Sequence, residues 1–170
     1  MLVTGCANPA GESANDGYNG LYFTDRELRE VVDGSLMLGV PAKAEHGGVQ
    51  LGHVVSSYLD SSGRLNCVMK IDERSVEGAI AAGLVRDGIA SELSLGYAVD
   101  VTHSADGEGV QAQTKEIHEI SLVRQGARHA CLITGYQDDS GATFTRVQAA
   151  ARAAQGTEAA ADPWSTFHID

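Results

Sequence analysis

Three polar positions in apolar surroundings have the residue types needed for nucleophilic catalysis. Ser94 lies in the apolar stretch Leu93-Ser94-Leu95, and His46 precedes a pair of glycines. A serine hydroxyl is a poor nucleophile until a neighbouring base removes its proton, and histidine titrates close enough to neutral pH to be that base. A third residue would fix the tautomer of the histidine, and both His118 and Glu119 are candidates for this role.

His118 and Glu119 are neighbours on one expected strand, so their side chains should point to opposite faces and only one can reach His46. The chain order of base, nucleophile and third member differs from the order in the common serine hydrolase folds. The turn Gly126-Ala127-Arg128 after this strand has a backbone N–H and a guanidinium that could stabilise an oxyanion. The pattern therefore predicts a serine hydrolase of unusual topology.

Composition narrows the class of protein and its partners. A chain of 170 residues with 43% hydrophobic residues is typical of one globular domain. A net charge of −11 argues against nucleic acid as a partner, because phosphate binding needs clustered lysine and arginine. The sequence contains no apolar run of about 18 residues and no signal peptide, which predicts no membrane partner and a location inside a cell.

The sequence predicts neither a metal nor a cofactor. The cysteines Cys6, Cys67 and Cys131 are too widely spaced for a disulfide framework or a zinc site. His46 and His53 could join His118 or Glu119 around zinc, but their spacing is not characteristic of metal ligands. No phosphate-binding or dinucleotide-binding glycine pattern is present.

Hydrophobic periodicity and turn signals predict the elements that carry these residues. Residues 5–19 read as a loop, and Thr24 with Glu27 forms a capping box for a helix that ends near Gly34. A second helix is expected over 73–86. The expected strands are 20–24, 36–44, 51–59, 65–71, 91–101, 110–123 and 130–136, with the turn 60–63 joining two of them into a hairpin.

These elements predict a mainly β fold with α, arranged as a small, mainly antiparallel barrel or curled sheet with flanking helices. Residues 1–136 are expected to form the domain. Residues 137–170 are rich in alanine and acidic residues and are expected to be a tail or linker, with a helix over 142–154 as one option.

Two segments around the candidate base and nucleophile are similar to known motifs. Glu45-His46, followed by Leu51-Gly52-His53-Val54, is similar to a D-H, spacer, V-G-R-V segment that carries a general base. Leu93-Ser94-Leu95, with Ser91 before it, is similar to an S-x-S-L nucleophile strand, and Ser94-Leu95-Gly96-Tyr97 is similar to S-x-G-[FY].

A third segment, Glu119-Ile120-Ser121-Leu122-Val123, is similar to an E-[VI]-S-[LV]-V strand. With these motifs, residues 20–136 resemble the herpesvirus assemblin and tailed-phage prohead protease superfamily of capsid maturation serine proteases. The resemblance implies a herpesvirus-protease-like barrel. It also implies Ser94 as the nucleophile and His46 as the general base.

The same resemblance bears on the remaining site residues. Counting back from Gly126-Ala127-Arg128 aligns Glu119, rather than His118, with the second catalytic histidine of assemblins, which favours a Ser-His-Glu triad. His118 stays as the alternative and would complete an assemblin-like Ser-His-His triad. It implies Arg128 on the oxyanion side, with Ala127 replacing the first arginine of the G-R-R pattern.

The implied function is a cofactor-free endopeptidase that cleaves an internal scaffold, and its own alanine-rich tail, within a procapsid in the cytoplasm or nucleus of an infected cell. Its implied partners are a scaffold or capsid protein and, in a homodimer, a second copy of the chain. The alternatives are a catalytically inactive scaffold-binding module of the same fold and an unrelated esterase.

Overall fold

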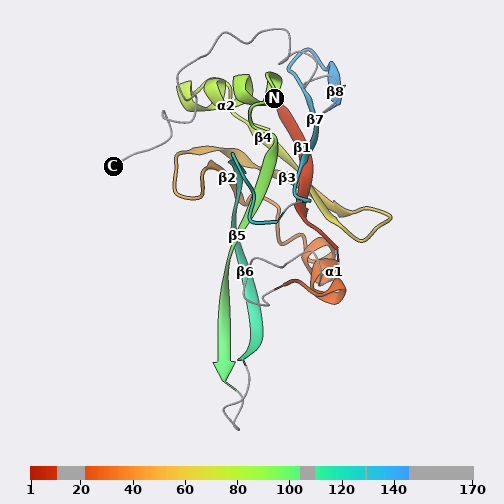
Figure 1. Cartoon of the computed structure of the whole chain (residues 1–170). Helices are drawn as coiled ribbons and strands as arrows, with labels where there is room; N and C mark the ends of the chain where they lie inside the picture. The colour runs from red at the N-terminus through yellow and green to blue at the C-terminus, as the bar shows by residue number, and fades with distance from the viewer. Residues whose placement is uncertain (11–21, 104–109, 129, 146–170) are drawn as a thin grey trace.

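The computed structural model describes residues 1–10, 22–103, 110–128 and 130–145, and Figure 1 shows their arrangement. Within these residues the chain forms eight strands and two helices. In chain order they are β1 (Leu2–Asn8), α1 (Asp25–Asp33), β2 (Pro41–Ala44), β3 (Gln50–Leu59), β4 (Leu65–Ile71), α2 (Val76–Arg86), β5 (Glu92–His103), β6 (Val110–Val123), β7 (Ile133–Gln137) and β8 (Thr143–Thr145).

All eight strands belong to one mixed sheet with the order β5-β6-β2-β3-β4-β1-β7-β8. The neighbouring strands are antiparallel except for the pair of β2 and β6, which is parallel. β5 and β6 form a long ribbon that extends well beyond the rest of the sheet (Figure 1). The prediction of a mainly β fold with α is therefore confirmed.

The described strands do not close into the predicted barrel. The sheet curls until the start of β5 meets the segment before β7, where Leu93 N donates to Cys131 O at 2.7 Å and Ile133 N donates to Ser91 O at 2.9 Å. This contact is an isolated bridge between Glu92 and Leu132. A continuous ladder cannot form, because β7 already pairs with β1 on one side and β8 on the other.

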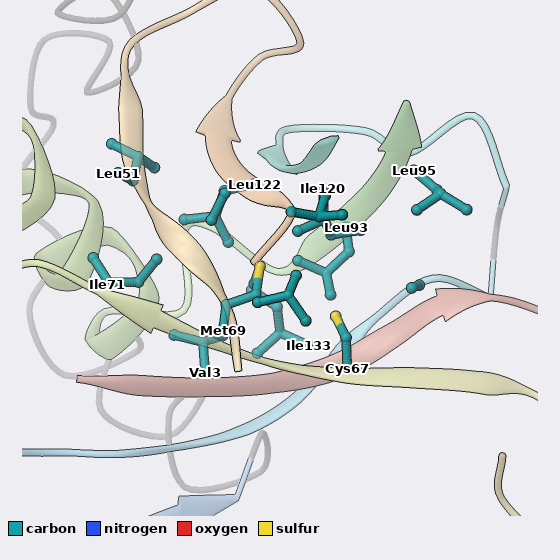
Figure 2. Packing of buried hydrophobic residues seen from close by; sticks show 14 of the residues in the cluster. Val3, Leu51, Cys67, Met69, Ile71, Leu93, Leu95, Ile120, Leu122 and Ile133 are labelled. Atoms are coloured by element: carbon teal, nitrogen blue, oxygen red, sulfur yellow. The ribbon is translucent and has the colours of Figure 1, made fainter. Parts of the chain in front are cut away.

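The core lies on the inner face of the curled sheet and follows from strand alternation. Leu93 and Leu95 of β5 and Ile120 and Leu122 of β6 are at most 5% exposed. Figure 2 shows them among side chains from β1, β3, β4 and β7. Because successive strand residues face opposite sides, the intervening residues of β5 and β6 gather on the other face. That face carries Ser94.

The helix predictions are largely confirmed. Thr24 caps α1, with Glu27 N donating to Thr24 Oγ1 at 3.2 Å and Thr24 N donating to Glu27 Oε2 at 2.7 Å, which completes the capping box. α2 begins at Val76, three residues later than predicted, because Ser75 is its N-cap and accepts from Gly78 N at 3.0 Å. Neither described helix has the length and apolar character needed to cross a bilayer.

Several predicted boundaries in the first half of the chain are wrong. Residues 5–8 belong to β1 rather than to a loop, and residues 22–24 are not a strand. The predicted strand 36–44 shortens to Pro41–Ala44, because residues 34–39 form turns with positive φ at Ser35 (53°) and Gly39 (81°). The predicted hairpin is confirmed as β3 and β4. Residues 11–21, which include the rest of the predicted loop and the start of the predicted strand 20–24, lie outside the described residues.

The sheet continues past the predicted end of the domain at residue 136. β8 pairs with β7 in the register of Tyr136 with Phe144, and these two rings stack with centroids 4.8 Å apart. Residues 143–145 are therefore a strand and not part of a helix over 142–154, whose remaining residues lie outside the described ones. The division of the chain into a domain and a tail stays a prediction.

Candidate active site

Strand register places the polar residues of three neighbouring strands in one row. Ser94 of β5 pairs with Ser121 of β6, and Ser121 pairs in turn with Lys43 of β2. Gly96 of β5 pairs with Glu119 of β6, two residues along on the same face. A Cβ at Gly96 would lie 2.5 Å from Glu119 Cγ, so only glycine leaves room for this carboxylate.

His46 lies in a tight turn directly after β2, which brings its ring over this row. Glu45 (φ 47°) and His46 (φ 57°) are both left-handed, a conformation that costs a non-glycine residue about 1 kcal/mol. The turn is held by Glu45 N donating to Leu122 O at 3.1 Å and Gly48 N donating to Ala44 O at 3.0 Å. Residues with strained backbone conformations cluster at functional sites, so two in succession favour a functional role for this turn.

A continuous chain of hydrogen bonds joins Ser94, His46 and Glu119. His46 Nε2 lies 2.7 Å from Ser94 Oγ, and His46 Nδ1 lies 2.8 Å from Glu119 Oε1. A carboxylate can only accept, so Nδ1 carries the proton and Nε2 is left with a lone pair for the serine hydroxyl. Ser94 and Glu119 are 5% and 6% exposed, whereas the His46 side chain is 48% exposed. The geometry is that of a general base between a nucleophile and an orienting acid.

Glu119 is held from several sides. Lys43 Nζ lies 2.9 Å from Glu119 Oε2, and Ser121 Oγ donates to Glu119 Oε1 at 3.3 Å. Burial by itself would raise the pKa of Glu119, but the hydrogen bonds and charges of Lys43 and His46 outweigh it, and this pKa is lowered. Glu119 is therefore ionised at neutral pH.

Sequence reasoning missed Lys43 and Ser121. Lys43 is the only polar residue of β2, which is a usable signal once β2 is known to border β6. Ser121 stood inside the strand motif without an assigned role.

His118 does not contact His46 in this structure. In the ladder between β5 and β6, Gly96 pairs with Glu119 and Tyr97 pairs with Ile117, so His118 is the extra residue of a bulge. Its side chain is exposed. The structure thus brings Glu119, and not His118, to the ring of His46.

The turn after β6 lies beside the strand of Ser94. A Cβ at Gly126 would lie 2.9 Å from Leu93 O, and Gly126 N donates to Glu92 Oε2 at 2.7 Å. Arg128 is buried and donates from Nη2 to the hydroxyl of Tyr97 at 2.8 Å, whereas Ala127 is exposed. The role of Ala127 and Arg128 at an oxyanion stays a prediction.

Comparison with solved structures identifies the fold. Thirty-three chains match. One is the protease of Kaposi's sarcoma herpesvirus (KSHV) in complex with a hexapeptide phosphonate inhibitor, with a TM-score of 0.52 and 17% identity over 81% of this chain. The chain has a herpesvirus assemblin-like fold. A second match, the same viral protease with an allosteric inhibitor, has a TM-score of 0.46 and 15% identity over 78% of this chain and 76% of that one.

The assemblin-like match spans 65% of the length of the inhibitor-bound viral protease. No protein-family profile matches the sequence, and no curated protein matches it. At this level of identity the likeness concerns the fold alone, so the chemistry of the site rests on its own geometry.

The described part of the assemblin-like fold contains no group of three or more histidine, cysteine, aspartate or glutamate side chains that could hold a metal ion. His53, which the zinc alternative would need, is exposed on β3, where it pairs with Pro41 and Lys70. The free thiols of Cys6, Cys67 and Cys131 are buried.

Proposed function

We propose that the chain is a serine endopeptidase in which Ser94 is the nucleophile, His46 the general base and Glu119 the residue that orients His46. The observation that carries the proposal is the hydrogen-bond chain of 2.7 Å and 2.8 Å through the two nitrogens of one imidazole. The assemblin-like fold supports the proposal, because the matched structure is a viral protease in complex with a hexapeptide phosphonate inhibitor.

The mechanism follows from the protonation states of this chain. Ser94 Oγ attacks the carbonyl carbon of the scissile peptide bond while His46 Nε2 takes the hydroxyl proton. The imidazolium that forms is stabilised by the ionised Glu119 on its other nitrogen. His46 then gives the proton to the leaving amine, the C–N bond breaks, and an acyl-enzyme ester on Ser94 remains.

Deacylation repeats these steps with water. His46 removes a proton from a water molecule, the resulting hydroxide attacks the ester, and the proton returns to Ser94 Oγ as the acid product leaves. Both steps pass through a tetrahedral oxyanion that needs N–H donors. We assign this role to the turn of Ala127 and Arg128, because its neighbour Gly126 packs against the backbone of Leu93, directly before the nucleophile.

The proposed substrate is the internal scaffold of a viral or phage procapsid, together with the alanine-rich segment that follows the described residues. The proposed setting is the procapsid within an infected cell, with a homodimer as the active assembly. These proposals extend from the assemblin-like fold, and peptide libraries and sedimentation analysis of the active species test them directly.

The deciding experiment is intact-mass spectrometry after exposure to a fluorophosphonate. The reagent phosphonylates an activated serine with loss of fluoride, so wild type should gain one adduct. Ser94→Ala should gain none, and His46→Ala should react at least about 100-fold more slowly. Absence of an adduct on wild type, at concentrations where the protein sediments as a dimer, would refute the enzyme and favour a scaffold-binding module. An adduct without peptide cleavage would favour an esterase.

A further inference from the structure

We propose that Lys43 and Ser121 are positioning residues that hold the Glu119 carboxylate against Nδ1 of His46. The inference rests on the proposed function of Ser94, His46 and Glu119, and it extends the site to five residues on three strands and one turn. Lys43 binds the Glu119 carboxylate, and Ser121 binds the same carboxylate and the backbone of His46. Their effect would therefore be exerted through Glu119.

Lys43 fixes the orientation of the carboxylate. The parallel pairing of β2 with β6 sets Lys43 beside Ser121, so its side chain starts from the row that also contains Ser94. Its ammonium binds Oε2 of Glu119 at 2.9 Å, while His46 Nδ1 binds Oε1 at 2.8 Å. With both oxygens bound from different directions, rotation of the carboxylate breaks at least one charge-assisted contact.

Ser121 ties the carboxylate to the strained turn. Its hydroxyl is completely buried; it accepts from His46 N at 3.3 Å and donates to Glu119 Oε1 at 3.3 Å. One hydroxyl thus links the backbone of His46 to the group that binds the ring of the same residue. Both bonds are long, so we expect Ser121 to contribute less than Lys43.

Lys43 also balances the charge of Glu119 next to the imidazole. A carboxylate without a counter-charge would hold a proton on His46 too strongly, and a protonated imidazole cannot accept from Ser94. The nearby carboxylates have other partners, since Glu45 accepts from Arg124 N at 3.0 Å and Glu92 accepts from Gly126 N.

The remaining charged groups around the row do not replace Lys43. Arg128 donates to Tyr97, and His118 is exposed at the bulge. Among the lysines and arginines that the structure describes, Lys43 alone lies within salt-bridge distance of Glu119. Its removal should therefore change the charge balance at His46 directly.

A purely structural salt bridge between β2 and β6 makes a different prediction. The Lys43 side chain is 32% exposed but that of Glu119 only 9%, so replacing Lys43 should lower stability in either role. If Lys43 only joined two strands, its replacement would leave the reactivity of Ser94 and its pH dependence unchanged. A positioning role instead moves both the reactivity and its pH dependence, whatever the change in melting temperature.

The test measures the second-order rate of fluorophosphonate labelling against pH for wild type, Lys43→Met, Lys43→Arg and Ser121→Ala. We expect Lys43→Met to react about 10- to 100-fold more slowly at pH 7, with the acid limb of its profile moved to higher pH. Lys43→Arg should recover most of the rate, and Ser121→Ala should lose about 5- to 10-fold. Lys70→Met is the matched control, since Lys70 is an exposed strand lysine on β4.

A second measurement separates this inference from the proposed function. Nitrogen-15 NMR of the histidine rings reports the tautomer of His46 without any turnover. Wild type should show a protonated Nδ1 above the acid limb, and in Lys43→Met the ring should become doubly protonated at a higher pH than in wild type. If wild type is not labelled, the proposed function fails, and the NMR comparison still decides the role of Lys43. Identical labelling profiles and identical spectra for Lys43→Met and wild type would overturn the inference.

Discussion

Gly96→Ala is the substitution that most directly tests whether Glu119 controls the reactivity of Ser94. Gly96 has no positive φ, and β5 would accept alanine at this position as far as the backbone is concerned. The obstacle is the carboxylate opposite. A Cβ at Gly96 would lie 2.5 Å from Glu119 Cγ and 3.0 Å from Oε1. The variant should therefore keep the fold and displace the acid.

The size of the effect follows from these distances. Two carbon atoms pack at about 3.5–4.0 Å, so Glu119 Cγ must retreat by about 1 Å. Moving the carboxylate by that amount stretches its 2.8 Å contact with His46 Nδ1 beyond hydrogen-bonding distance. A misplacement of about 1 Å in a catalytic array costs about 100-fold in rate, or about 2.7 kcal/mol in activation free energy.

The assay is the second-order rate constant of fluorophosphonate labelling at pH 7.5, with circular dichroism to verify the fold. Gly83→Ala is the matched control, because a Cβ at this position of α2 meets no atom within 4 Å. The double variant with Glu119→Gln should be little slower than Glu119→Gln alone, since both changes act on one contact. Labelling of Gly96→Ala within about threefold of wild type, with an intact fold, would refute the assignment of Glu119.

Three further predictions concern the third member of the site, helix α2 and the N-cap of α1. Glu119→Gln should slow labelling by about 100-fold or more, whereas His118→Ala should stay within about twofold of wild type, and the two rates measured side by side decide the third member. Gly83→Ala should raise the unfolding free energy in urea by about 0.5–1 kcal/mol, because it replaces a helical glycine in open space. Burial alone would raise the pKa of Glu27, but hydrogen bonds from Lys115 and Thr24 lower it. The stability that Glu27 contributes should therefore be present at pH 7 and lost as the pH falls through its lowered folded-state pKa, so Glu27→Gln should be less stable than wild type at pH 7 and converge with it in acid.

The sequence was most informative where alternation and local turn chemistry decide structure. The hairpin of β3 and β4 and the strands β5 and β6 follow from patterns of period two, and the capping box of Thr24 and Glu27 acts within one helical turn. The same alternation puts Leu93 and Leu95 in the core and leaves Ser94 on the opposite face. Local signals therefore sufficed to place Ser94 on its strand and on the face opposite the core.

Local signals misled where distant strands decide the outcome. Gly5 and Asn8 read as turn formers, yet both lie in β1, an interior strand of the sheet. A Cβ at Gly5 would lie 2.6 Å from Leu93 Cδ1 and 2.9 Å from Leu132 O, so glycine there reflects close packing where the sheet curls. Lys43 escaped notice for the same reason, because its importance depends on the parallel pairing of β2 with β6.

The choice between Glu119 and His118 shows how register determines chemistry in this site. Adjacent residues of a strand face opposite sides, so a slip of one residue between β5 and β6 would exchange the carboxylate for the imidazole. The ladder prevents that slip in two ways. It pairs Glu119 with Gly96, which is the one glycine of β5, and it leaves His118 in the adjacent bulge. A glycine two residues after the proposed nucleophile thus has a physical role, because it leaves space for the Glu119 carboxylate. A change at Gly96 should therefore affect the reactivity of Ser94 before it affects folding.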